Sequence, residues 1–516
     1  MHWGIWSRAG ALLLAAVLSG CVAQNINPVT GKPIYTRGVT PAIEAAAGKK
    51  ANDELTASYG VYKEDPALSA YVDRIGQTLV KNTVRKDIRY TFTILNDDEI
   101  NAYALPGGYV YVTRGALNFA NSEAEIAGII GHEIGHVDAF HFGRSDHDTV
   151  KILLSVLLRH SSQSIDDLAL AKKLADESAR SSDYSQEQEL EADALGIHYM
   201  ALAGYDPEGI LVAMRTGDAK TALDDGKMKG NPIAHEMFAL DQSHPATPQR
   251  EAHALEAAKV EAAKVEMMNV EEAKLAAASE PAPGAVAAAA PAGAAPMRNR
   301  DAYLAAVDGM TFGEDPVDGT VEGRRLVNAA LGFGFEAPPD FDLWVSHGGV
   351  FGIGPKAALV IEQTEDYTGQ SLAAYVQSSM MDKLSVTDVR PLEIDGWRGA
   401  TGVAANDPFT IRLAAVHDRG NHLYKLLYVA HRRAFDDLDA GFLASLKSFR
   451  GLEGAEAKPR PALRLHVVTV KPGDTVKSLA ERMAVKEKKL EWFRVLNGLA
   501  AGDDVTPGDK VKLVVE

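Results

Sequence analysis

The sequence contains very little cysteine: Cys21 is the single cysteine among 516 residues. A chain with one cysteine cannot form an intramolecular disulfide framework, so a disulfide-stapled fold is excluded. An excess of positive charge is also missing, because 53 Lys and Arg stand against 70 Asp and Glu, for a formal net charge of −17. We therefore expect no basic stripe that follows phosphates, and no nucleic-acid partner.

Long apolar runs are absent too, since no segment reaches the 18 or more uninterrupted apolar residues of a membrane-spanning helix. The run ALLLAAVL after Arg8 is too short to cross a bilayer and is typical of a signal peptide. The following LSGC resembles the bacterial lipobox, which implies that residues 1–20 are a lipoprotein signal peptide and that Cys21 is lipidated. Val22 implies, by the same resemblance, the periplasmic side of the outer membrane; a plain secretory signal is the alternative.

The chain length predicts two or three domains. Apolar residues recur at helical spacing over residues 41–86. Residues 90–117 alternate apolar and polar side chains around Pro106, Gly107 and Gly108, which predicts two strands joined by a turn. Residues 256–299 are first helical and then Ala/Pro-rich, a composition that predicts a linker.

Two further units are predicted beyond this linker. Residues 300–450 alternate short strands with helices, which indicates an α/β (α+β) domain with a largely antiparallel sheet. Its stretch GFGFEAPPDFDLW faintly resembles the PsbP/Mog1-like group. Residues 463–516 form a small third unit that starts and ends in strand-like segments.

The stretch AEIAGIIGHEIGHVDAFH carries His132 and His136 four residues apart, so both imidazoles project from one face of a helix. Ser122 followed by Glu125 is a capping box that would start this helix. Glu133 lies beside the histidines, where it can accept a proton from a metal-bound water. A chance occurrence of the motif is the alternative, but two histidines and a glutamate on an apolar helix would then be costly to bury.

A third ligand is needed to complete a zinc site. A metzincin would require glycine at 139 and histidine at 142, and the chain has Ala139 and Phe142. The stretch YSQEQELEADALGIHYM instead offers Glu189 as a ligand, with Asp193 one turn later to support a histidine. Glu187 and Glu191 compete for the ligand role, and a solvated acidic helix face is the structural alternative.

These stretches together resemble the M48 family of zinc metallopeptidases. HEIGH and EQELEADALG carry the resemblance, together with NPVTGK, NAYALPGGYVYVTRGAL and SHPATPQR. The resemblance implies a mainly α zincin-type (gluzincin) domain with a small β-sheet over residues 21–255 and one Zn²⁺ per chain. It implies the ligands His132, His136 and Glu189, with Glu133 as general base and Asp193 in support. Phe140 departs from the family, where Arg often precedes the following histidine.

Substrate contacts are expected on residues 107–113, which we predict to be an edge strand that binds an extended polypeptide through backbone hydrogen bonds. An ordinary core strand is the alternative reading. The predicted substrate-binding residues are Gly107, Gly108, Tyr109, Val110 and Tyr111.

Two residues of SHPATPQR are candidates for the site. His244 is expected near the open metal position, where it would assist catalysis or block water; capping a turn before Pro245 is the alternative. Arg250 is expected to pair with a carboxylate.

Residues 463–516 resemble a LysM domain, through HVVTVKPGDTVKSLAERM, LEWFRVLNGL and VTPGDKVKLVV. The resemblance implies a βααβ fold that binds N-acetylglucosamine polymers and hence peptidoglycan. A LysM-like fold that has lost glycan binding is the alternative.

The sequence therefore predicts a multidomain, lipid-anchored zinc endopeptidase that acts on unfolded or misassembled proteins in envelope quality control. Two alternatives stay open: a non-catalytic chaperone-like or scaffolding lipoprotein, and a wall-remodelling hydrolase that acts on peptidoglycan.

Overall fold

The structure is a computed structural model. It describes residues 23–35, 41–144, 182–228, 247–278 and 295–516, except 347–348, 355, 365–368, 370, 379, 381–383, 407, 419–421, 455 and 459. Cys21, His244 and the Ala/Pro-rich part of the linker lie outside the described residues. Within these ranges, no helix is both long enough and apolar enough to cross a membrane.

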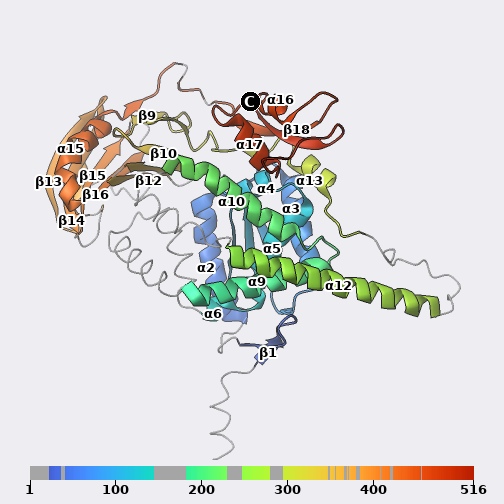
Figure 1. Ribbon diagram of the computed structural model, residues 1–516. Coiled ribbons are helices and arrows are strands. Elements are labelled where there is room, and N and C mark those ends of the chain that lie inside the picture. Colours follow the sequence, from blue (N-terminus) through green and yellow to red (C-terminus); the bar gives the residue numbers. More distant parts are fainter. Residues whose placement is uncertain are drawn as a thin grey trace, which may run out of the picture.

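The first region is mainly helical and surrounds one buried helix, α5 (Glu123–Asp138) (Figure 1). The other described helices of this region are α2 (Pro41–Tyr59), α3 (Pro66–Val80), α4 (Arg114–Phe119), α6 (His141–Arg144), α9 (Ser182–Leu202), α10 (Gly209–Met228) and α12 (Pro248–Ala278). The expected helices over 41–86 are confirmed as α2 and α3, and α3 begins at an Asp65 cap that accepts from two backbone N–H groups. Figure 1 shows the far end of α12 reaching beyond the rest of this region.

Two small sheets accompany these helices. β1 (Ala23–Ile26) and β2 (Pro33–Tyr35) form an antiparallel hairpin. The second sheet has three strands in the order β3-β5-β4, namely β3 (Thr91–Leu95), β5 (Tyr109–Thr113) and β4 (Ala102–Leu105). Residues 90–117 therefore form three strands and not the two predicted. The segment NDDEI, residues 96–100, interrupts the first predicted strand and separates β3 from β4.

The middle region is β-rich. Its larger sheet has the order β10-β11-β12-β16-β15-β14-β13, and every pairing in it is antiparallel. These strands are β10 (Asp342–Ser346), β11 (Gly349–Gly354), β12 (Ala357–Thr364), β13 (Val386–Ile394), β14 (Trp397–Asn406), β15 (Phe409–His417) and β16 (Leu423–His431). A smaller sheet joins β17 (Arg450–Gly451), β9 (Phe333–Glu336), β8 (Arg325–Asn328) and β7 (Thr320–Glu322). The predicted antiparallel character is confirmed.

Each face of the seven-stranded sheet packs against one helix. Along β15, Ala414 and Val416 belong to the cluster with α15 (Arg432–Lys447), whereas Leu413 and Ala415 belong to the cluster on the other face, with α14 (Leu372–Ser378). Because successive side chains of a strand point to opposite faces, a strand buried on both sides is apolar almost throughout.

The last region has the order β18 (Leu463–Thr469), α16 (Val476–Ala480), α17 (Lys489–Leu496) and β19 (Lys510–Val515). β18 pairs with β19 and also with β6 (Thr311–Phe312), which follows α13 (Arg300–Val307). Side chains of α13, β6 and this C-terminal unit share one hydrophobic cluster with the first region. The packing therefore does not follow the predicted boundary at residue 300, because α13 and β6 pack with the helical region and the C-terminal unit.

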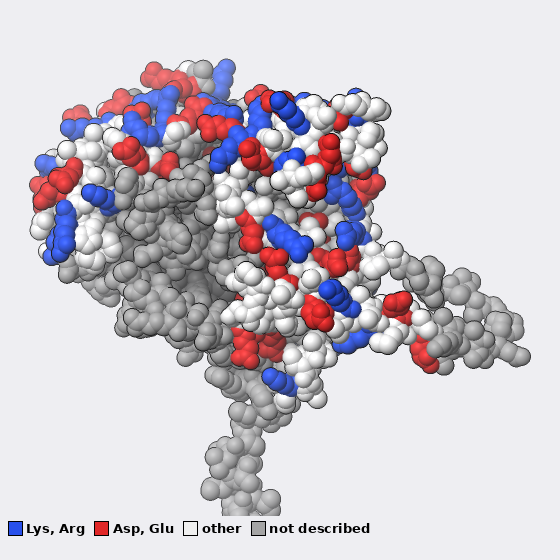
Figure 2. Space-filling view, viewed as in Figure 1, with Lys and Arg blue, Asp and Glu red and all other residues white. Residues whose placement is uncertain are grey.

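Charged side chains of both signs are interspersed over the described part of the face in Figure 2. Acidic side chains lie beside basic ones there, so the charges on this described part of the face are mixed rather than of one sign.

Candidate metal centre

The helix α5 presents the HEIGH motif inside the protein. Ser122 caps it, accepting from the Glu125 backbone N–H, while the Glu125 carboxylate accepts from the backbone N–H of Asn121. Its side chains are buried almost without exception, including both histidines and Glu133. The sequence-based start of this helix is thus confirmed.

Glycines allow α5 and α9 to approach closely. A Cβ atom on Gly135 would lie 2.6 Å from the carbonyl oxygen of Ala192, and a Cβ on Gly196 would lie 2.7 Å from the backbone of Gly131 and His132. Both distances are too short for a side chain, so only glycine permits this contact between the two backbones. The short separation brings the acidic face of α9 over the histidines of α5.

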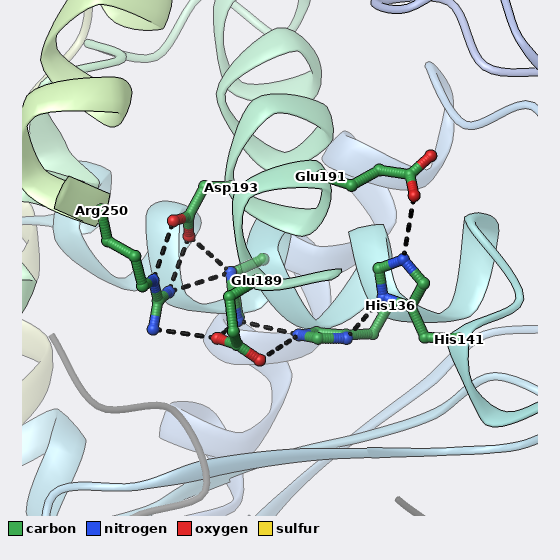
Figure 3. A network of polar contacts seen from close by, with 7 residues as sticks. His136, His141, Glu189, Glu191, Asp193 and Arg250 are labelled. Atoms are coloured by element: carbon green, nitrogen blue, oxygen red, sulfur yellow. Dashed lines mark hydrogen bonds and ion pairs between the residues drawn. The ribbon is translucent and has the colours of Figure 1, made fainter. Parts of the chain in front are cut away.

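Three side chains from the two helices converge on one point (Figure 3). The Nε2 atoms of His132 and His136 lie 3.0 Å apart, and each lies 3.3 Å from an oxygen of the Glu189 carboxylate. One ligand atom from each residue lies within 4.8 Å of the others, and all three residues are buried. This arrangement is a potential metal site.

Asp193 of α9 and Arg250 of α12 support this cluster. The Asp193 carboxylate lies 2.7 Å from His132 Nδ1. The Arg250 guanidinium donates to both Asp193 oxygens at 2.8 and 2.9 Å, and its third nitrogen lies 2.9 Å from Glu189. The expected pairing of Arg250 with a carboxylate is present, and it joins two carboxylates at once.

The charges of this cluster shift the pKa values of its members. Burial opposes ionisation of His132, but Asp193 and Glu189 outweigh it and raise the pKa of His132 to about 10. Burial together with the neighbouring His132 and His141 holds the pKa of His136 well below its usual value, despite Glu189. Although burial alone would raise the pKa of Asp193, His132 and Arg250 hold it below its ordinary value.

The residues present fit a divalent metal. Two imidazole nitrogens and one carboxylate, all aimed at a common point, are the donor set that suits a catalytic zinc and leaves a position open for water. His132 already has a carboxylate at its far nitrogen, as metal-binding histidines normally do.

The remaining acidic candidates on α9 do not join the three ligands. Glu187 is exposed to solvent. Glu191 instead lies 3.2 Å from Nε2 of His141, whose Nδ1 is 2.8 Å from Nδ1 of His136. Sequence reasoning missed this contact of His141 with a ligand; its spacing of five from His136 was the available signal.

The prediction of an edge strand at residues 107–113 was wrong. β5 pairs in parallel with β3 and antiparallel with β4, so both of its backbone edges are occupied. Gly107 and Gly108 have φ values of +82° and +87° and form the turn before this strand. Val110 and Tyr111 are each 1% exposed and belong to the core. Tyr109 is the half-buried residue at the start of the strand.

Comparison with known proteins shows what the segment around the site is similar to. Residues 66–258 match the sequence profile "Peptidase family M48". "Beta-barrel assembly-enhancing protease" of Escherichia coli is 31% identical over 154 residues, which are 28% of this chain and 32% of that protein. "Mitochondrial metalloendopeptidase OMA1" of Arabidopsis thaliana is 31% identical over 160 residues, covering 28% and 31%. "Metalloprotease YcaL" of Escherichia coli is 25% identical over 255 residues, covering 46% and 91%.

The chain spans about a third of the length of the first curated relatives that it matches. Among solved structures, cyanobacterial PsbP from Synechocystis aligns with 27% of this chain and 98% of its own, at 14% identity and a TM-score of 0.21, which is too low to assign a fold. The three residues of the potential metal site, His132, His136 and Glu189, thus all lie within the segment that is similar to peptidase family M48.

Proposed function

We propose that this protein is a zinc-dependent endopeptidase of the bacterial envelope that hydrolyses unfolded or misassembled proteins in outer-membrane and periplasmic quality control. The observation that carries the proposal is the convergence of His132 and His136 from α5 with Glu189 from α9. The match of residues 66–258 to the M48 profile and the names of the relatives support it.

The roles of the side chains follow from their positions. Zinc held by His132, His136 and Glu189 would supply a Lewis acid that polarises the scissile carbonyl and lowers the pKa of water. Glu133 follows His132 on the same buried helix and acts as general base, then returns the proton to the leaving amine. Asp193 accepts from Nδ1 of His132 and so fixes its tautomer, and Arg250 holds Asp193 in place.

An extended polypeptide requires an unpaired strand edge, and β5 offers none. The outer strands of this sheet, among the described residues, are β3 and β4, and β4 is the one that packs against α5, so we assign the substrate contact to β4 rather than to β5. Pairing through the backbone depends on an extended conformation more than on side chains, which suits unfolded substrates.

Cys21 and His244 lie outside the residues that the structure describes, and both have a proposed role. Cys21 would carry the lipid that anchors the protein on the periplasmic side of the outer membrane. His244 would lie near the open metal position, where it assists the reaction or blocks water. Replacing His244 by Ala should change turnover, and unchanged turnover would remove it from the site.

The test of the peptidase function is the Glu133→Gln variant of the mature chain, with casein as substrate and zinc content measured in parallel. We expect zinc content to stay at one per chain while casein cleavage falls by at least about 100-fold. Glu187→Gln, an exposed change on α9, is the matched control and should keep full activity. A wild-type chain that binds zinc but cleaves no casein would favour a non-catalytic scaffold.

A second candidate function has a specific observation in its favour. The order strand, helix, helix, strand over residues 463–516 is the order expected of a LysM-like unit, and peptidoglycan is its proposed ligand. Such a unit would hold the peptidase at the cell wall or mark a wall-remodelling hydrolase. Digestion of purified sacculi compared with unfolded protein separates these two roles, and a pulldown on peptidoglycan tests the binding itself.

A further inference from the structure

The NPVTGK stretch forms the turn of the β1–β2 hairpin, and its asparagine is buried. The Asn27 side-chain oxygen accepts from the backbone N–H groups of Val29 and Thr30, at 2.9 and 3.0 Å, and so closes the turn. Asn27 is 1% exposed. Its amide nitrogen points the other way and donates to Oε1 of Glu191 at 2.7 Å, across 164 positions of sequence. The hairpin therefore reaches the acidic helix α9.

From Glu191 the contacts continue to a metal ligand. The second oxygen of Glu191 lies 3.2 Å from Nε2 of His141, and Nδ1 of His141 lies 2.8 Å from Nδ1 of His136 (Figure 3). Nε2 of His136 is the nitrogen that faces Glu189 and His132. If Nε2 binds the metal, Nδ1 of His136 must carry the proton and donate it to His141. His141 then carries its own proton on Nε2 and donates to Glu191.

A left-handed residue positions His141 for this contact. Phe140 has φ of +55°, which is uncommon for a residue with a side chain, and it lies between the end of α5 and the start of α6. Its ring is buried, with the Arg85 guanidinium 5.5 Å away. Packing on both sides thus holds the chain reversal that returns His141, itself 1% exposed, to His136.

The two ligand histidines are consequently supported in different ways. His132 contacts the carboxylate of Asp193 directly, whereas His136 reaches a carboxylate only through a second imidazole. We propose that Asn27, Glu191 and His141 are positioning residues for the metal ligand His136, and that the NPVTGK hairpin is a structural part of the metal centre. This inference rests on the proposed metal site.

The experiment is a chelator competition that measures the zinc affinity of the full mature chain. Glu191→Gln removes the carboxylate, and Asn27→Asp keeps an oxygen for the turn but replaces the donor with a second negative charge. We expect zinc to bind about 10- to 100-fold more weakly to both variants. Lys32→Ala, an exposed change in the same hairpin, is the matched control and should leave the affinity unchanged.

A second pair of variants separates positioning from general structure. His141→Gln keeps one acceptor and one donor in the side chain, and it should retain more zinc affinity than His141→Leu. The absorption spectrum of the Co²⁺-loaded chain should change in Glu191→Gln while its circular dichroism matches the wild type.

The outcomes are distinguishable. The inference would be overturned if the wild-type chain binds zinc and the variants at Asn27, His141 and Glu191 all have a zinc affinity within twofold of the wild type. The proposed metal site would then still stand. A wild-type chain that binds no zinc would overturn the proposed function itself. Should Asn27→Asp fail to fold, Glu191→Gln still decides, because Glu191 carries none of the turn contacts.

Discussion

The middle region follows the Ala/Pro-rich linker, and the C-terminal unit follows the short segment 451–462, which contains Pro459 and Pro461. The two units nevertheless differ in whether they share a hydrophobic core with the helical region. The middle region buries its apolar side chains in two clusters of its own. The C-terminal unit instead shares its core with the helical region, where the rings of Trp492, Phe119 and Phe312 contact one another. A linker in the sequence therefore does not show whether the segment after it folds alone.

Strand pairing explains the difference. Phe312 pairs with Leu463, and Thr311 pairs with Arg464, so the chain leaves β6 and returns to the adjacent β18 after the whole middle region. The middle region is thus an insertion between two neighbouring strands. Insertions of this kind are tolerated because their two ends lie close together.

The most severe test of this comparison is a pair of deletions. Removing residues 463–516 should prevent the helical region from folding, because each large apolar side chain left without its partner loses about 1.5–3 kcal/mol of burial. The total would exceed the whole stability of a domain, about 5–15 kcal/mol. Replacing residues 316–460 with a short Gly/Ser linker should leave a folded chain with its zinc affinity. Circular dichroism checks both, and a folded chain after the first deletion would contradict the shared core.

Lys512 provides a single-residue version of the same test. Its side chain is completely buried, and its Nζ donates to the carbonyl oxygens of Asn118 and Ala120, both at 2.6 Å. Lys512→Ala should lower the free energy of unfolding by about 3–5 kcal/mol, because two buried carbonyl groups lose their donor and the removed side chain leaves a cavity. Urea unfolding measures this change.

Lys510, two residues earlier on β19, is the control for that variant. Its ammonium is partly exposed and lies 3.2 Å from the exposed Asp301. Lys510→Ala should cost no more than about 0.5 kcal/mol. Equal effects of the two changes would mean that burial of Lys512 is not what joins the units.

Metal removal should affect one of the two folding units only. A ligand present at 100 times its dissociation constant stabilises the native state by about 2.7 kcal/mol, and EDTA removes that amount. We expect EDTA to lower the midpoint temperature of unfolding, measured by calorimetry, for the unit that contains α5 and α9. The midpoint temperature of the middle region should not change. A shift of both transitions would show that the units unfold together.

A pH dependence is expected for the stability of the middle region. Burial raises the pKa of Glu362 to about 7 from the ordinary 4.5, although Lys425 acts against it. The folded state therefore holds a proton that the unfolded chain has already lost, and stability falls as the pH rises from about 4.5 to 7. The loss is at most about 3.4 kcal/mol.

Glu362→Gln should flatten this part of the stability curve, measured by urea unfolding of the middle region between pH 4 and 8. Glu393→Gln, an exposed change on β13 of the same sheet, should leave the curve unchanged. If the free energy of unfolding of Glu362→Gln changes with pH as steeply as that of the wild type, another group causes the pH dependence.

Local patterns predicted much of the site. The spacing of His132 and His136 and the spacing of Glu189 and Asp193 are fixed by helical periodicity, so the sequence alone showed which side chains share a face. The structure brings both pairs together. Their catalytic and metal-binding roles stay predictions.

Long-range pairing could not be predicted in the same way. Whether β5 lies at an edge or in the centre depends on β3, which joins it in parallel from a separate segment. The contact between Asn27 and Glu191 likewise joins residues 164 positions apart. Periodicity within a segment carries no information about which other segment packs on it. For the same reason, the sequence did not show that α13 and β6, which follow residue 300, pack with the helical region.

The position of Lys512 has a consequence for the order in which the protein can mature. The two carbonyl oxygens that it supports lie just before the helix with the HEIGH motif, and Lys512 is synthesised 394 residues after Asn118. During synthesis, α5 therefore exists for a long time without the side chain that supports the carbonyl groups before its first turn. A chain released before that lysine would carry the HEIGH motif on a scaffold that lacks the support of Lys512.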